Sequence, residues 1–466
     1  MTADDYRDSG LEFPADFVLG SATAAYQIEG AVTEDGRGPS IWDTFSHTPG
    51  ATSNGDTGDV ADDHYHRMES DLDLMARLGL ESYRFSIAWP RIQPTGKGAV
   101  NKPGLAFYSR LVDGLLERGI RPIATLYHWD LPQALQDVGG WPNRDTSYRF
   151  AEYASLVGAQ LGDRVGSWTT LNEPWCSAHL GYGAGVHAPG ISNDLHALRA
   201  AHHLSLAHGL GLQELRRVVT HPDAEYSITL NLHVLRGEDD TSAEALRRID
   251  AVGNRIFTGP MLRGAYDDDL LDDTKAITDW AFVESGDLDD IHQPIDFLGV
   301  NYYTTNVVRM RKGPAPDATA GGSVWPGSRD VEFLEQPGAQ TSMGWTIAPD
   351  GLEELLVSLH DQFPDLPLII TENGAAFDDV EEDGRVRDAN RIDYLRRHFT
   401  AAHRAMARGV DLRGYLVWSL LDNFEWSFGY DKRFGLVRVD YETQERIVKD
   451  SARWFSELIA TRRIPA

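Results

Sequence analysis

The chain has 466 residues, of which 42% are hydrophobic and 24% charged, and its formal net charge is −28. Such an acidic balance argues against nucleic acid and anionic membrane surfaces as partners. The single cysteine, Cys176, excludes intrachain disulfides and cysteine-rich metal sites. Because no stretch has the roughly 18 apolar residues of a membrane span, and no apolar signal lies at the N-terminus, we expect a cytoplasmic protein.

No Pro/Ser-rich linker or low-complexity tract divides the sequence, and α/β barrels of this length commonly form one domain. We therefore predict a single catalytic domain over residues 1–466. The most loop-like stretches, 50–58 and 313–340, are predicted surface insertions. The oligomeric state is left open, with a homo-oligomer among the alternatives.

Apolar, strand-like runs alternate with amphipathic, helix-like segments along the chain. In the helix-like segments apolar residues recur at steps of three and four, as at Leu105, Tyr108, Leu111, Val112 and Leu115. The predicted strands are 17–23, 82–89, 121–127, 165–171, 226–232, 295–302, 366–371 and 414–421. The predicted helices between them include 70–78, 104–118, 148–161, 195–218, 243–261, 349–363 and 392–408.

Eight such βα units predict an α/β fold of the (β/α)₈, or TIM barrel, type. An open doubly wound sheet is the alternative, and it fits less well because no Gly-rich phosphate loop follows the first strand. In a (β/α)₈ barrel the active site lies at the C-terminal ends of the strands. The residues that follow each predicted strand are therefore the candidates for function.

Two of these strand ends carry a glutamate. They are Thr170-Leu171-Asn172-Glu173-Pro174 and Ile370-Thr371-Glu372-Asn373-Gly374. Two carboxyl groups that face each other across one site can cleave a glycosidic bond, one as a proton donor and the other as the attacking group. A salt bridge at a strand end is the alternative for either glutamate taken alone.

The other strand ends carry hydrogen-bonding or aromatic side chains. Indole rings can stack on the apolar faces of a sugar, while amides, carboxylates and histidine can bind its hydroxyls. These strand ends therefore favour a polyhydroxylated ring as the ligand. The residues are Gln27, Arg84 to Trp89, His128-Trp129-Asp130, Asn231 with His233, Asn301 to Tyr303, and Trp418 on to Glu425-Trp426.

With these residues in place, the chain resembles glycoside hydrolase family 1, the β-glucosidase-like retaining glycosidases, over nearly its full length. The resemblance rests on seven segments that occur in the family's order. They are Phe17 to Gly30 (FVLGSATAAYQIEG), Tyr83 to Arg91 (YRFSIAWPR), His128 to Pro132 (HWDLP), Thr170 to Pro174 (TLNEP), Asn301 to Tyr303 (NYY), Thr371 to Gly374 (TENG) and Trp418 to Trp426 (WSLLDNFEW).

The resemblance implies a double-displacement reaction with Glu173 as the general acid/base and Glu372 as the nucleophile. Arg84 and Tyr303 match the family positions that support the charged form of Glu372. The implied activity is that of a retaining β-glucosidase acting on terminal non-reducing β-D-glucosyl residues, with β-galactosyl and β-fucosyl residues as further candidates. The chemistry needs no cofactor and no metal.

The resemblance also implies which residues bind the sugar. Asn172 could bond the 2-hydroxyl, and Trp129 is expected to act as a supporting member of the site. Trp175, Cys176 and the loops 183–191 and 313–340 are expected on the aglycone side. The full implied set is Gln27, His128, Trp129, Asn172, Asn301, Trp418, Glu425 and Trp426.

Several alternatives remain at this stage. Glu425 would repel a phosphate, so an unphosphorylated sugar is expected. The thioglucosidase branch of the family has glutamine at the position of the acid, so Glu173 indicates an O-glycosidase. A transglycosidase would carry the same residues, whereas a sugar-binding protein without activity usually lacks one carboxylate. A metal hydrolase could use His64 and His66, which have ligand-like spacing. Those histidines lead into a predicted helix rather than ending a strand, so helix capping and packing are favoured for them.

Overall fold

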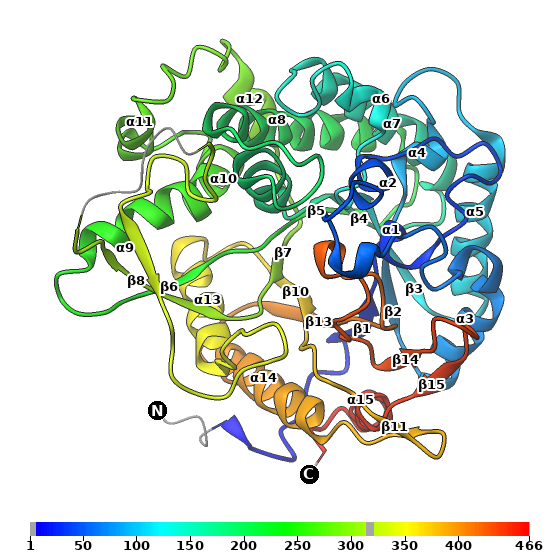
Figure 1. The fold of residues 1–466 in the computed structure, drawn as a ribbon. Helices are drawn as coiled ribbons and strands as arrows, with labels where there is room; N and C mark the ends of the chain where they lie inside the picture. Colours follow the sequence, from blue (N-terminus) through cyan, green and yellow to red (C-terminus); the bar gives the residue numbers. More distant parts are fainter. Residues whose placement is uncertain (1–5, 314–320, 466) are drawn as a thin grey trace.

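The computed structural model describes residues 6–313 and 321–465. Residues 1–5 of the acidic N-terminus, 314–320 of the predicted insertion, and 466 lie outside the described residues. The eight predicted strands close into a parallel barrel in the order β1-β13-β10-β7-β5-β4-β3-β2 (Figure 1). The predicted (β/α)₈ fold is confirmed, and the open sheet is wrong. The barrel strands are β1 (Val18–Ala22), β2 (Ser82–Ser86), β3 (Arg121–Tyr127), β4 (Ser167–Asn172), β5 (Glu225–Leu230), β7 (Phe297–Asn301), β10 (Leu368–Asn373) and β13 (Leu412–Trp418).

Helices form the outer layer around this ring of strands (Figure 1). In α7, Phe150, Tyr153, Ala154 and Val157 recur at helical spacing and are fully buried. An added Cβ at Gly211 of α8 would lie 2.8 Å from the Phe150 ring, so α7 and α8 are closely packed. The principal helices are α3 (His64–Leu78), α5 (Lys102–Glu117), α7 (Asp145–Leu161), α8 (Asp194–Val218), α13 (Pro349–Gln362), α14 (Ala389–Ala407) and α15 (Asp450–Thr461).

The predicted helix 243–261 is wrong as a continuous element. Here α9 (Ala243–Asp250) is followed by π-helical turns at Ala251–Arg255 and Gly259–Arg263, with α10 (Ile256–Thr258) between them. Pro260 has no backbone N–H to donate to the preceding turn, and the two glycines lower helix propensity, so regular α-geometry ends. The shorter helices elsewhere are α1 (Ala25–Ile28), α2 (Ile41–Ser46), α4 (Trp89–Ile92), α6 (Gln133–Gln136), α11 (Asp268–Thr274) and α12 (Asp287–Ile291).

In the part of the chain that the structure describes, three small sheets lie outside the barrel. The largest joins β6, β8 and β9, on the left in Figure 1, and β9 falls within the stretch 313–340 that was predicted to be a loop. The extra strands are β6 (Val234–Gly237), β8 (Thr305–Met310), β9 (Val331–Leu334), β11 (Glu381–Glu382), β12 (Arg385–Val386), β14 (Val437–Val439) and β15 (Arg446–Val448).

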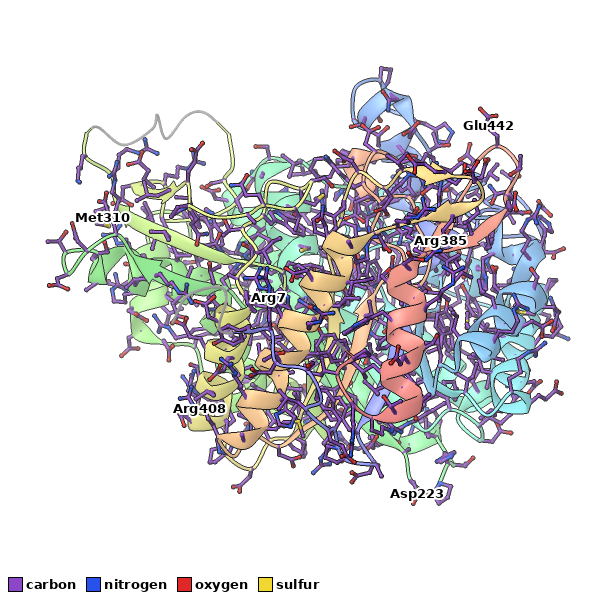
Figure 2. All side chains as sticks on the ribbon, turned by 90° about the horizontal axis from the view of Figure 1, so that it is seen from below. Arg7, Asp223, Met310, Arg385, Arg408 and Glu442 are labelled. Carbon is purple, nitrogen blue, oxygen red and sulfur yellow. The ribbon has the colours of Figure 1, made fainter. Side chains whose placement is uncertain are left out.

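The two ends of the barrel strands lie on opposite sides of the molecule in Figure 2. Figure 2 shows Asp223 and Arg408, which precede β5 and β13, on the lower side. Arg385 and Glu442, in segments that follow β10 and β13, lie on the upper side, where the strands end.

The Tyr153 hydroxyl donates to the carbonyls of Ile87 and Leu126, at 2.9 Å each. Helix α7 thus holds the C-terminal ends of β2 and β3 in place. Among the described helices, none is long and apolar enough to cross a membrane.

The contact between α14 and the barrel gives a test of how the outer layer is held. Phe399 is fully buried, and its ring stacks on Tyr415 of β13 at 4.0 Å and 20°. Phe399→Ala should lower the free energy of unfolding by about 3–5 kcal/mol, because it leaves a cavity at this contact. Urea unfolding followed by circular dichroism measures the change. The control Tyr148→Ala removes a ring that is 44% exposed, and should stay within about 0.5 kcal/mol of the native chain. An equally small effect of Phe399→Ala would contradict this account of the packing.

Candidate active site

A cavity of about 380 Å³ opens at the C-terminal ends of the barrel strands. Most of the predicted site residues line it, and the remaining three, Gln27, Arg84 and Asn172, are buried and bond to lining residues. The predicted residues on the cavity wall are His128, Trp129, Glu173, Asn301, Tyr303, Glu372, Trp418, Glu425 and Trp426.

Glu173 directly follows β4 and has a backbone φ of 45°. This left-handed conformation is uncommon for a residue with a side chain, and here the Glu173 N–H donates to Thr229 O at 3.0 Å. The carboxyl accepts hydrogen bonds from Asn301 Nδ2 at Oε1, at 2.6 Å, and from Cys176 Sγ at Oε2, at 3.1 Å. Burial and the nearby charge of Glu372 raise the pKa of Glu173 to about 7.

Glu372 lies in β10, and its carboxyl has two strong donors. Arg84 Nη1 donates to Oε1 at 2.6 Å, and the Tyr303 hydroxyl donates to Oε2 at 2.8 Å. Burial raises the pKa of Glu372, while the Arg84 guanidinium and the Tyr303 hydroxyl oppose this by stabilising the anion. Since Glu173 has only neutral donors, a proton shared by the pair resides on Glu173 and the charge resides on Glu372.

Asn172 links the two carboxyls. Its Oδ1 accepts from Arg84 Nη2 at 2.7 Å and from Asn301 Nδ2 at 3.1 Å, which fixes the orientation of the amide. Its Nδ2 then donates to His128 Nε2 at 3.0 Å, so the proton of the neutral imidazole is on Nδ1. Thr371 Oγ1 donates to Asn301 Oδ1 at 2.8 Å and orients that side chain as well.

Two buried polar atoms at the other side of the cavity have no partner in the part of the chain that the structure describes. They are His128 Nδ1 and Gln27 Oε1. Burial and the Arg84 charge keep the pKa of His128 well below its usual value, so the ring is neutral. A buried donor and a buried acceptor without partners would both be satisfied by ligand hydroxyls. Gln27 Nε2 donates to Phe424 O at 2.8 Å and approaches Glu425 Oε2 at 3.4 Å.

Indole rings form a wall beside these polar atoms. Trp426, with a φ of 52°, packs at 4.6 Å from Trp129 and 4.7 Å from Trp42. Trp129 Nε1 donates to the Asn172 carbonyl at 2.9 Å, so this ring also supports the polar network. The Trp418 ring lies 5.8 Å from His128 at 25°. This wall offers apolar faces against which a sugar ring can pack.

The outer cavity contains residues that the sequence indicated only in part. Trp175 and Cys176 line it as predicted, and the two predicted aglycone loops each contribute one lining residue, His187 and Trp325. Asn231 and His233, which the sequence marked as a strand cap, also line it. The lining residues that sequence reasoning missed are Leu180, Leu232, Thr304, Asn306, Met343, Trp345, Phe428 and Phe434. Trp345 packs at 5.3 Å from Tyr303, but no strand end or motif marks its segment.

The histidines of the pair His64 and His66 face different partners. His64 is the first residue of α3, and its Nδ1 bonds Asp71 Oδ2 at 2.8 Å. His66 bonds Asp63 at 2.6 Å and Glu34 at 3.1 Å. Within residues 6–313 and 321–465 no group of three or more His, Cys, Asp or Glu side chains is placed to hold a metal ion.

A closed (β/α)₈ barrel with two bridged glutamates beside an indole wall defines a carboxylate-based glycosidase site. The model of Glycosyl hydrolase family 1 matches residues 10–464. The chain therefore belongs to glycosyl hydrolase family 1, as the resemblance implied.

Two curated relatives and two solved structures illustrate this membership. The chain is 57% identical to the bifunctional β-D-glucosidase/β-D-fucosidase of Bifidobacterium breve, over 96% of this chain and 98% of that protein. It is 47% identical to β-glucosidase A of Thermotoga maritima, over 96% of this chain and 98% of that protein. The structure of the AHE enzyme from Alicyclobacillus herbarius matches with a TM-score of 0.92, 50% identity, and coverage of 98% and 99%. The family 1 β-glucosidase structure from T. maritima matches with a TM-score of 0.91, 46% identity, and coverage of 98% and 100%.

The buried Glu425 carboxyl gives a prediction that needs no substrate. Burial and the charges of Glu372 and Glu173 raise its pKa from an ordinary 4.5 to about 8. A raised pKa means that this group favours folding below about pH 4.5, and that the contribution is lost as the pH rises through about 8. Glu425→Gln removes this titration, so its melting temperature relative to the native chain should rise from pH 5 to about pH 8 and then level off.

Differential scanning calorimetry across that pH range measures the effect. The control is Glu442→Gln, which removes a carboxyl at an exposed position and should change the melting temperature little. A pH-independent difference for Glu425→Gln would contradict the assigned burial of this charge.

Proposed function

We propose that the protein is a retaining β-glucosidase that removes terminal non-reducing β-D-glucosyl residues from oligosaccharides and from aryl and alkyl glycosides. One observation carries the proposal: a chain of hydrogen bonds joins the two carboxyls, and only Glu372 bonds a cation, the Arg84 guanidinium. From Glu372 the bonds run through Arg84, Asn172 and Asn301 to Glu173. The names of the relatives support glucose as the sugar. The bifunctional relative supports β-fucosides as further substrates.

In the first step Glu372 attacks the anomeric carbon and the bond from that carbon to the aglycone oxygen breaks. Glu173 gives its proton to the departing oxygen, and a covalent glycosyl ester on Glu372 results. Arg84 and Tyr303 keep the attacking carboxylate ionised and fixed in one orientation. The raised pKa of Glu173, about 7, keeps it protonated for this step at mildly acidic pH.

Esterification prepares the second step. Once Glu372 is an ester, its negative charge no longer raises the pKa of Glu173, so the Glu173 carboxylate formed in the first step persists. That carboxylate takes a proton from water while the water oxygen attacks the anomeric carbon, and Glu372 leaves as a carboxylate. Two inversions at one carbon retain the β configuration.

We assign the sugar hydroxyls to Gln27, His128, Asn172 and Glu425. The partnerless His128 Nδ1 and Gln27 Oε1 support two of these contacts. Asn172 would bond the 2-hydroxyl, where the contact strengthens in the transition state. We place Trp418 and Trp426 against the ring, while Trp129 and Asn301 hold Asn172 in place. The steps use carboxyl groups throughout and need no cofactor. A single catalytic domain over 1–466, a cytoplasmic location and a homo-oligomeric state stay predictions from the sequence.

The roles of the two carboxyls can be separated by substitution. Glu372→Gln should lower turnover of 4-nitrophenyl β-glucoside by about 10⁴-fold or more, because no nucleophile remains. Glu173→Ala should regain turnover with added azide and form β-glucosyl azide, since azide needs no general base. Release of 4-nitrophenol with and without EDTA, and NMR of the azide product, are the measurements.

The matched control is Glu353→Gln, which changes a buried glutamate that bonds the Tyr6 hydroxyl at 2.7 Å and lies on α13, outside the cavity. Its turnover should stay near that of the native chain. Undiminished activity in Glu372→Gln would contradict the mechanism, and loss of native activity in EDTA would favour a metal hydrolase. Glucose binding by a native chain that hydrolyses no β-glycoside would favour the binding protein.

Substrate charge gives a further prediction. The buried Glu425 lies at the sugar end of the cavity with Glu372 and Glu173 near enough to raise its pKa, so a phosphate dianion there would meet three acidic groups. We expect kcat/KM for 4-nitrophenyl 6-phospho-β-glucoside to be at least about 100-fold below that for the unphosphorylated glucoside. A higher kcat/KM on the phosphorylated sugar would refute the assignment of Glu425.

A further inference from the structure

Cys176, the only cysteine of the chain, contacts the carboxyl that we assign as the general acid/base. It begins the π-helical segment Cys176–Ala184, directly after the strand end that carries Glu173. The Cys176 N–H donates to the Glu173 carbonyl at 2.9 Å, which fixes this turn. Cys176 is 6% exposed, and its Sγ lies 3.1 Å from Glu173 Oε2. Asn231 Nδ2 approaches the same sulfur at 3.6 Å from the end of β5.

These contacts give the thiol one direction in which to donate. Asn231 presents an N–H to the sulfur, so the S–H proton is directed at the carboxyl oxygen. Burial and the adjacent Glu173 charge raise the pKa of Cys176 well above its ordinary value, so the thiol keeps its proton through the reaction. The other oxygen of the carboxyl is held by Asn301 Nδ2 at 2.6 Å. Both oxygens of Glu173 are therefore oriented, one by an amide and one by a thiol.

The strength of each donor matters for an acid that must also act as a base. A hydroxyl at this position would stabilise the Glu173 anion strongly and make the carboxyl a poorer base in the second step. A thiol is a weak donor, so it can orient the carboxyl with less effect on its acidity. The carboxyl also faces four charged or titratable groups on other elements. They are Glu372 of β10, Arg84 of β2, Glu425 after β13, and Tyr303 after β7. None of these four charged or titratable groups is altered by a change at Cys176.

We propose that Cys176 is a positioning residue for Glu173, whose thiol holds the carboxyl toward the departing glycosidic oxygen while stabilising its anion only weakly. The proposal rests on the assignment of Glu173 as the general acid/base. The alternative is that the thiol only fills space beside Asn231 in the wall of the cavity.

The alkaline limb of the kcat/KM profile distinguishes these roles, because it reports the loss of the Glu173 proton in the free enzyme. Cys176→Ala removes a donor to the anion, so the limb should move to higher pH by about half a unit. Cys176→Ser supplies a stronger donor, so the limb should move to lower pH by a similar amount. The substrate is 4-nitrophenyl β-glucoside over pH 5 to 9. Ser177→Ala is the control, since it alters the next residue, whose hydroxyl lies near Tyr127, and it should leave the limb in place.

The dependence on the leaving group provides the second readout. Departure of 2,4-dinitrophenolate needs no proton, whereas departure of an alkoxide does. Cys176→Ala should therefore lower kcat/KM for octyl β-glucoside by about three- to ten-fold and leave that for 2,4-dinitrophenyl β-glucoside within about two-fold. Cys176→Ser should recover most of the loss on the octyl substrate. Melting temperatures of all variants confirm that the comparison is made on folded protein.

The proposal would be overturned if the alkaline limb of kcat/KM stays at the native pH in both Cys176 variants. Equal losses of kcat/KM on the octyl and dinitrophenyl substrates would overturn it as well, and the thiol would then only fill space. Failure of the alanine variant to fold would leave the serine variant, whose downward shift alone decides the question. A native chain inactive on both glucosides would instead contradict the proposed function itself, whatever the behaviour of the Cys176 variants.

Discussion

The Arg84 guanidinium provides the interaction on which the site depends. A buried carboxyl ordinarily takes up a proton, because the charged form loses its hydration. Arg84 Nη1 bonds Glu372 at 2.6 Å and Nη2 bonds Asn172 at 2.7 Å, so one planar cation both supports an anion and orients the neighbour of the second carboxyl. The difference between the two glutamates follows from this placement. Glu372 has a full positive charge against it, whereas Glu173 has an amide and a thiol.

The barrel makes this placement possible. Arg84 lies in β2, Asn172 ends β4, and Glu372 lies in β10, so only a closed ring of strands brings them together. Thr125 Oγ1 of β3 accepts from Arg84 Nε at 3.1 Å and sets the plane of the guanidinium. The left-handed backbone at Glu173 and Trp129, just past the ends of β4 and β3, marks places where strand ends turn side chains into the cavity, and Trp426 adopts the same conformation in the segment after β13. The well-packed outer helices hold these conformations in place.

The sequence predicted the barrel and most of the polar and aromatic residues that line its inner cavity, because both follow local rules. Strands such as β3 are short apolar runs between amphipathic helices, and polar residues at their ends lie on one face by topology alone. The interrupted helix after Asp250 and the strand β9 did not follow from periodicity, since π-turns and outer sheets obey no simple pattern. Trp345 was missed because its contact with Tyr303 depends on the path of a long connection. The thiol of Cys176 was placed on the aglycone side, but its bond to Glu173 depends on side-chain geometry that spacing does not specify.

The most direct test of the central claim is to trap the covalent intermediate on Glu372. The native chain would be treated with 2,4-dinitrophenyl 2-deoxy-2-fluoro-β-D-glucoside, digested, and mapped by mass spectrometry. We expect one fluoroglucosyl group on Glu372, together with loss of activity. We also expect much slower labelling of Arg84→Met, because the Glu372 carboxyl is then protonated more of the time. A label on Glu173 or on any other residue, or inactivation with no covalent adduct, would contradict the assignment of the nucleophile.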